Sequence, residues 1–138
     1  MTESAPRRVG KLEVGIVTTD LDAITRFYQD TLGLEHIGDL DMPGGLMRRW
    51  AQGDAVLKAV QWERPQELAN PPRGFRGGAT GLRWLTIQID DVAQGAERCR
   101  AAGYAVPVPT FEHRPGALLA IVEDPERNWV ELIQPERE

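Results

Sequence analysis

Apolar and polar positions alternate near the start of the chain and then change to a helical spacing. Residues 12–19 (LEVGIVTT) alternate and are rich in β-branched side chains, which predicts a strand. Asp20 stands where a helix N-cap belongs, and Gly33 supplies a stop. Between them the apolar residues recur at helical spacing: Leu21, Ile24, Phe27, Tyr28 and Leu32. The pattern predicts a strand followed by one amphipathic helix.

Two further apolar stretches complete the first half of the chain. Residues 45–52 (GLMRRWAQ) and 55–62 (AVLKAVQW) predict strands that are joined by a hairpin turn. Residues 42–45 (MPGG) are interpreted as a flexible segment, and residues 66–80 as a proline- and glycine-rich connector.

The same order of elements starts again after the connector. Residues 82–90 (LRWLTIQID) predict a strand, Asp91 a cap and Gly103 a stop. Residues 117–124 and 128–135 predict two closing strands around the turn DPERN, which is a turn and not a catalytic acid pair. The halves match with Glu13 on Trp84 and Asp20 on Asp91, both 71 residues apart, and with Lys58 on Glu131, 73 residues apart. The repeat predicts an α+β fold of two tandem βαβββ modules.

Strand alternation divides the side chains between two faces. One face carries only apolar residues and is expected to meet the helices: Val14, Ile16, Leu57, Leu85, Ile87, Ile89, Val130 and Leu132. The other face carries Glu13, Lys58, Trp84 and Glu131, together with Gln88 and Trp129. This mixed face is the expected ligand-binding face.

Composition narrows the class of protein. The 138 residues are 41% hydrophobic and 27% charged, which suits a single globular domain over residues 1–138. Within it we expect module one at about 10–64, the connector at about 65–81 and module two at about 82–135. The formal net charge of −5 argues against nucleic acid as a partner. No apolar run reaches membrane length, so a cytoplasmic protein is expected. Cys99 is the only cysteine, and we expect it in the core.

Three segments resemble the vicinal oxygen chelate superfamily, which includes glyoxalase I, extradiol dioxygenases and bleomycin-resistance proteins. They are residues 14–34 (VGIVTTDLDAITRFYQDTLGL), 85–104 (LTIQIDDVAQGAERCRAAGY) and 123–135 (EDPERNWVELIQP). The resemblance implies that the sheets curl into a U-shaped cleft and that the chain forms a homodimer. It also implies that the metal-ligand positions of metal-dependent members fall on Glu13, Lys58, Trp84 and Glu131.

These four residues make a poor metal site. The indole of Trp84 only donates hydrogen bonds, and the charge of Lys58 repels a cation. Two carboxylates could hold Mg²⁺ with water, whereas a transition metal wants nitrogen donors. We therefore expect no metal and no other cofactor. We hypothesise that Lys58 replaces the ion and pairs with Glu13 and Glu131, either as a structural salt bridge or as an acid–base site.

The remaining candidates are ligand-binding residues. Flat indole rings suit a small planar or sugar-like organic ligand, and we assign this role to Trp84, Trp129 and Trp50. Alternation points one of Arg48 and Arg49 into the cleft, where it would favour an anionic substrate. Gln88 lies on the mixed face, and His113 lies in residues 109–116 (PTFEHRPG), which we interpret as a loop that could act as a lid.

Three functions remain open. The favoured one is a metal-independent enzyme of isomerase, lyase or cyclase type, in which Glu13 and Glu131 move protons and Lys58 stabilises negative charge. The second is a protein that sequesters a drug or metabolite, as bleomycin-resistance proteins do, and the acidic net charge suits a cationic aromatic ligand. The third is a metal-dependent lyase or dioxygenase of glyoxalase type, against which the missing histidines argue.

Overall fold

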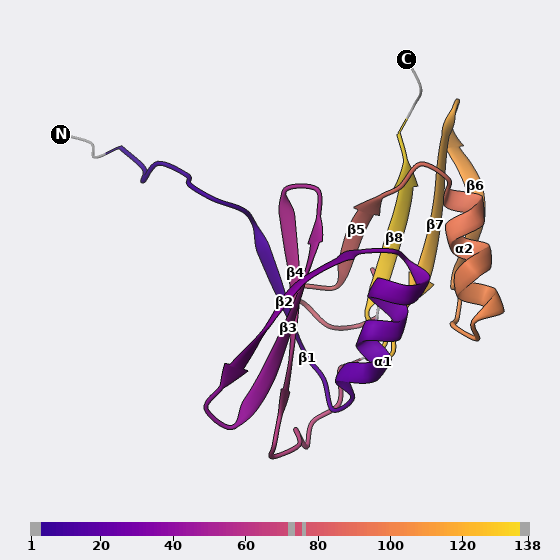
Figure 1. Cartoon of the computed structure of the whole chain (residues 1–138). Coiled ribbons are helices and arrows are strands. Elements are labelled where there is room, and N and C mark those ends of the chain that lie inside the picture. Colours follow the sequence, from indigo (N-terminus) through magenta and orange to yellow (C-terminus); the bar gives the residue numbers. More distant parts are fainter. Residues whose placement is uncertain (1–3, 72–73, 76, 136–138) are drawn as a thin grey trace.

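The two halves of the chain fold into two modules of the same design (Figure 1). The computed structural model describes residues 4–71, 74–75 and 77–135. The first module contains β1 (Glu13–Val17), α1 (Leu21–Thr25), the π-helix η1 (Arg26–Thr31), β2 (Glu35–Met42), β3 (Gly45–Gln52) and β4 (Ala55–Trp62). The second contains β5 (Trp84–Gln88), α2 (Val92–Ala101), β6 (Val108–Arg114), β7 (Ala117–Glu123) and β8 (Trp129–Gln134).

Each module forms a four-stranded mixed sheet. The strand order is β1-β4-β3-β2 in the first sheet and β5-β8-β7-β6 in the second. The pairs β1/β4 and β5/β8 are parallel, and the other neighbours are antiparallel. The predicted α+β fold of two βαβββ modules is confirmed. A curl of the sheets into a U-shaped cleft stays a prediction.

The strand register repeats between the modules. Gly15 lies opposite Lys58 in the first sheet, and Thr86 lies opposite Glu131 in the second. Lys58 and Glu131 therefore occupy equivalent places on β4 and β8, as the alignment of the two halves predicts.

The helix starts repeat as well. Asp20 and Asp91 each accept a hydrogen bond from the backbone N–H three residues further on, at 3.0 Å in both modules. A glutamine side chain from the last strand of each module, Gln61 or Gln134, accepts from the first N–H of the helix at 2.8 and 3.0 Å. These contacts satisfy N–H groups that a helix leaves without partners at its start.

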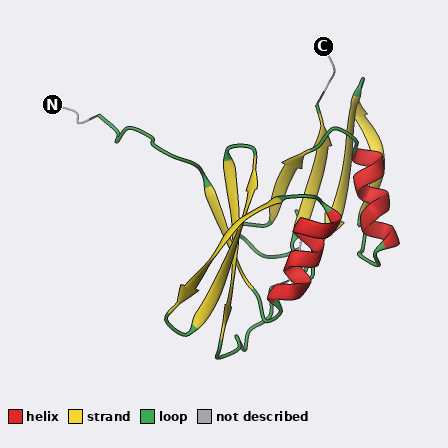
Figure 2. Cartoon of the chain, in the orientation of Figure 1, coloured by secondary structure: helices red, strands yellow, loops and turns green. Residues whose placement is uncertain are grey.

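One hydrophobic core extends through both modules. Figure 2 shows the helices on one side of their sheets. All the residues of the predicted apolar row belong to this core or pack against it: Val14, Ile16, Leu57, Leu85, Ile87, Ile89, Val130 and Leu132. Cys99 has no exposed surface, which confirms its place in the core, and burial raises the pKa of its thiol to about 11.

Two aromatic side chains of η1 reach the second module. The Tyr28 hydroxyl donates to Asp124 Oδ2 at 2.7 Å, and the Phe27 ring packs edge to face on Tyr104 at 4.9 Å. Burial raises the pKa of both Tyr28 and Asp124. Asp124 also accepts from the backbone N–H groups of Glu126 and Asn128, so it organises the predicted turn of residues 124–128.

One predicted element is wrong. Residues 109–116 were expected to form a loop, but Val108–Arg114 is the strand β6, paired with β7. β6 is an edge strand that is stabilised by its hydrogen bonds to β7. The local sequence alone does not indicate that pairing, so it did not predict a strand here. Residues 42–45 (MPGG), expected to be flexible, lie at the β2–β3 hairpin. None of the helices described in the structure is long and apolar enough to cross a membrane.

Candidate functional site

Each sheet has a face that points away from the helices, which we call the open face. On the second sheet it carries the predicted mixed row. Trp84 lies opposite Trp129, and Thr86 lies opposite Glu131, across the parallel pair β5/β8. The structure thus brings two predicted ligand-binding tryptophans and one predicted catalytic glutamate onto neighbouring strands.

Three aromatic rings meet on this open face, and we call Phe75, Trp84 and Trp129 the aromatic surface. The Phe75 ring lies 4.6 Å from the Trp84 ring and 5.6 Å from the Trp129 ring, at 74° to both. Phe75 is 48% exposed and Trp84 is 49% exposed, so about half of each large side chain faces solvent. Exposed apolar rings gathered at one place are typical of a binding surface.

The connector supplies Phe75, and Gly74 makes this approach possible. Gly74 has a φ of 81°, and a Cβ atom built on it would lie 2.8 Å from the Trp129 ring. A larger residue would strain the backbone and push on the indole. Sequence reasoning missed this contribution, because an aromatic residue in a proline- and glycine-rich connector has no periodicity; its only signal is an apolar ring in a polar segment.

Two polar side chains adjoin the aromatic surface. Thr86 Oγ1 donates to Glu131 Oε1 at 2.8 Å, which holds one carboxylate oxygen on the open face. Gln88 lies further along β5 with an exposed side chain, and its backbone carbonyl oxygen accepts from Gln52 Nε2 of β3 at 3.0 Å. That contact joins the second sheet to the first.

The open face of the first sheet carries Lys58 and Arg49, which lie opposite each other on β4 and β3. Glu13 is exposed on β1, opposite Val56. In the described part of the chain no ion pair joins Lys58 to Glu13 or Glu131. The proposed pairing of these three residues therefore stays a prediction.

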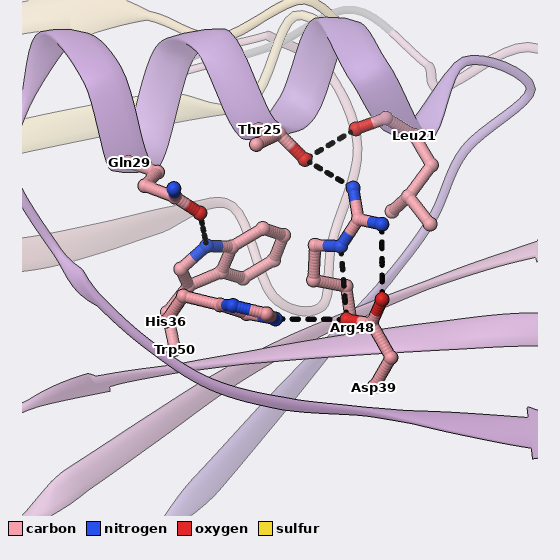
Figure 3. A network of polar contacts seen from close by, with 7 residues as sticks. All are labelled: Leu21, Thr25, Gln29, His36, Asp39, Arg48 and Trp50. Carbon is pink, nitrogen blue, oxygen red and sulfur yellow. Dashed lines mark hydrogen bonds and ion pairs between the residues drawn. The ribbon is translucent and has the colours of Figure 1, made fainter.

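Arg48 lies on the other side of β3, against α1 (Figure 3). Its guanidinium donates to Asp39 Oδ1 at 2.9 Å, to Asp39 Oδ2 at 3.0 Å and to Thr25 Oγ1 at 3.0 Å. His36 Nε2 contacts the same carboxylate at 2.8 Å. The hydrogen bond from Arg48 lowers the pKa of Asp39 to about 2. Arg49, opposite Lys58, is therefore the arginine of the pair that lies on the open face.

Trp50 and His113 lie apart from the aromatic surface. Trp50 has no exposed surface, and its indole N–H donates to Gln29 Oε1 at 3.0 Å on the helix side (Figure 3). In this structure Trp50 is a core residue. His113 is exposed in the edge strand β6, with its ring 6.5 Å from that of Phe111. Their assignment as ligand-binding residues has no support from their positions.

Two hollows adjoin the aromatic surface and the connector. One of about 110 Å³ lies between β1 and β5 and includes Gly15 and Trp84 in its wall. Another of about 540 Å³ lies between β1, the connector and the 124–128 turn. Its wall includes Gly15, Thr19, Leu68, Asn70 and Glu126. Neither wall includes Glu13, Lys58 or Glu131.

The residues at the implied metal-ligand positions do not suit a transition metal. Trp84 offers only a donor group, and Lys58 adds positive charge, which leaves one carboxylate on each sheet. No group of three or more His, Cys, Asp or Glu side chains among the described residues could hold an ion.

The chain belongs to the Glyoxalase/Bleomycin resistance protein/Dioxygenase superfamily, whose family model matches residues 11–132. This confirms the resemblance noted in the sequence. A comparison with curated proteins found no match.

Solved structures give the same fold. TnmS3, an antibiotic binding protein from Streptomyces sp. CB03234, has 24% identity and a TM-score of 0.68 over 96% of this chain and 100% of its own. A glyoxalase/bleomycin resistance protein from the same organism has 25% identity and a TM-score of 0.62 over 90% of this chain and 98% of its own. Glyoxalase I from Zea mays has 19% identity and a TM-score of 0.72 over 93% of this chain. The match covers 45% of the maize chain.

Proposed function

We propose that this protein binds a small planar organic molecule against the aromatic surface of Phe75, Trp84 and Trp129. The observation that carries the proposal is the half-exposed state of Phe75 and Trp84 beside a third ring. A flat ligand that covers these rings removes apolar area from water, and each Å² contributes roughly 25 cal/mol. The neighbouring Glu131 and Thr86 offer polar contacts to the edge of such a ligand.

The comparisons support a ligand-binding role. TnmS3 is described as an antibiotic binding protein, and a second relative carries the name of the bleomycin-resistance proteins. Binding without turnover needs only the aromatic surface and a few polar groups, both of which adjoin one another here. Sequestration of a small organic molecule is therefore the function that the geometry favours.

A second candidate is proton transfer without a metal, with Glu13 and Glu131 as acid and base and Lys58 as the electrostatic partner. Its support is Glu131, whose carboxylate lies beside the aromatic surface with Oε1 held by Thr86. The variant Glu131→Gln separates the candidates. An enzyme would keep ligand binding and lose turnover, whereas a sequestering protein would show no turnover in either form.

The proposal also includes a homodimer, which family membership favours. Sedimentation velocity at two protein concentrations tests it. A single species of monomer mass at both concentrations would remove the dimer from the proposal and leave the aromatic surface untouched.

Titration calorimetry with three planar compounds (2-naphthol, quinoline and 9-acridone) tests the binding proposal. At least one should bind the wild type, and Trp84→Leu should weaken that affinity about tenfold, because it removes about 1.5 kcal/mol of ring contact. Trp62→Leu is the matched control, since Trp62 lies on β4 against Gly45 and outside the aromatic surface. Equal affinity in wild type and Trp84→Leu would sink the proposal.

A further inference from the structure

Two cations lie side by side in the middle of the first sheet's open face. Lys58 on β4 is opposite Arg49 on β3, so their side chains leave the sheet on the same side. Residues directly opposite on antiparallel strands have Cβ atoms about 4.5–5.5 Å apart, and like charges at such a pair are destabilising. A pair of this kind therefore needs a counter-charge.

The described part of the chain does not supply that counter-charge. Neither Lys58 nor Arg49 forms an ion pair or a hydrogen bond with a described residue, and Arg49 Nε is buried without a partner. Arg48 differs, because its guanidinium donates two hydrogen bonds to Asp39 on the neighbouring strand β2. Of the two consecutive arginines, Arg48 therefore has an acidic partner, and Arg49 has none among the described residues.

Glycines flank the two cations at the same level of the sheet. The strand register gives the row Gly15–Lys58–Arg49–Gly38 across β1, β4, β3 and β2. A Cβ on Gly15 would lie 4.0 Å from Lys58 Cε, and one on Gly38 would lie 3.6 Å from Arg49 Nη2. Gly38 follows a register shift in β2 and has a φ of 138°. The side chains of Lys58 and Arg49 therefore lie next to these glycines, and neither glycine carries a side chain that could cover the cations.

We propose that Lys58 and Arg49 form a binding site for the oxyanion of a small molecule, a carboxylate or a phosphate group. The planar guanidinium of Arg49 presents paired N–H donors, and the Lys58 ammonium adds a point charge from the neighbouring strand on the same face. The site occupies the first sheet and rests on no contact of the aromatic surface. It also gives Lys58 a role that needs neither Glu13 nor Glu131.

Lysine labelling tests this site with a control inside the same chain. Lys58 and Lys11 are the only two lysines, so acetic anhydride labelling can be followed at both by peptide mass spectrometry. The probes are inorganic phosphate and benzoate, each compared with chloride at equal ionic strength. When the anion concentration is about three times its Kd, about a quarter of the sites are free. The labelling rate of Lys58 should then fall about fourfold, whereas the labelling rate of Lys11 should not change.

Variants of Arg49 extend the test. Arg49→Met should raise the Kd of the protecting anion about tenfold, because it removes a charge-assisted contact, and Arg49→Lys should restore part of the protection. Arg64→Met removes the same charge from an exposed position after β4 and should leave protection unchanged. Protection by phosphate alone, by benzoate alone or by both supports the site and names its ligand class. Equal slowing at Lys58 and Lys11, or none at either, would overturn it, even if Arg49→Met does not fold.

Discussion

Arg48 and Arg49 are neighbours in sequence, but they lie on opposite faces of β3. Arg48 faces α1, where Asp39 and Thr25 accept its hydrogen bonds. Arg49 faces outward beside Lys58, and no described residue pairs with it. Strand alternation therefore makes one arginine part of the fold and leaves the other for a ligand.

Substitution should separate the two roles. Arg48→Met should lower the free energy of unfolding by about 1 kcal/mol, because its contacts with Asp39 are partly screened by solvent. Arg49→Met should change it by less than about 0.5 kcal/mol, since it also relieves a like-charge pair. Urea denaturation measures both. Equal losses in the two variants would contradict the assignment of faces.

Asp39 should make the fold sensitive to acid. Its pKa is lowered to about 2 from an ordinary 3.8, mainly by the hydrogen bond from Arg48. Since the folded state holds fewer protons than the unfolded state between these values, the stabilisation is complete above about pH 4 and is lost as the pH falls to about 2. The wild type should exceed Asp39→Asn in stability at pH 5, and the difference should shrink toward pH 2. A difference that does not change with pH would show that Asp39 acts without its charge.

At the scale of elements, the connector contributes to the second sheet. Its described residues form no helix or strand, yet Phe75 contacts Trp84 and Trp129 of β5 and β8. The contact depends on the backbone of Gly74, which has a φ of 81°.

Gly74→Ala should therefore move Phe75 away from the two tryptophans. The substitution strains the backbone and places a methyl group 2.8 Å from the Trp129 ring, so we expect a stability loss of about 1–2 kcal/mol. Near-ultraviolet circular dichroism should weaken, because the ring packing changes. Gly78→Ala is a matched control, since Gly78 also has a positive φ but no atom within 4 Å of its Cβ position. The same spectral change in both variants would count against the contact.

At the scale of the whole molecule, the two modules share one core and should unfold together. The buried hydrogen bond from Tyr28 to Asp124 joins η1 to the end of β7. Tyr28→Phe should cost about 1–3 kcal/mol, because Asp124 Oδ2 keeps only the contact from Asn128 Nδ2. Denaturation followed by fluorescence and by far-ultraviolet circular dichroism should give one coincident transition.

The same tyrosine predicts a loss of stability in alkali. Burial raises the pKa of Tyr28 well above 10. Above about pH 10 the unfolded chain loses this proton first, so the folded state binds more protons and stability falls as the pH rises. The alkaline loss should be smaller in Tyr28→Phe. An identical alkaline profile in both forms would assign the effect to other groups.

The sequence predicts those parts of the fold that periodicity determines. The bounds of β3 and β4 follow from their apolar stretches, and the helix starts follow from Asp20 and Asp91. The position of β6 could not be predicted, because its pairing with β7 and not its composition makes residues 108–114 a strand.

Strand periodicity predicts only part of the candidate site. Alternation placed Trp84, Trp129 and Glu131 on one face, but it could not say which of Arg48 and Arg49 faces outward, because only tertiary packing fixes that choice. The approach of Phe75 depends on the path of the connector, which has no repeating pattern.

The central claim is that a planar ligand binds to the aromatic surface, and the four tryptophans allow one direct measurement. Each indole N–H gives its own signal in a two-dimensional ¹H–¹⁵N NMR spectrum. On addition of 2-naphthol, quinoline and 9-acridone in turn, at least one compound should shift the Trp84 and Trp129 signals. Trp50, whose N–H is bonded to Gln29 in the core, should not move. If no compound shifts Trp84 and Trp129, or if Trp50 moves with them, the aromatic surface is not the binding site.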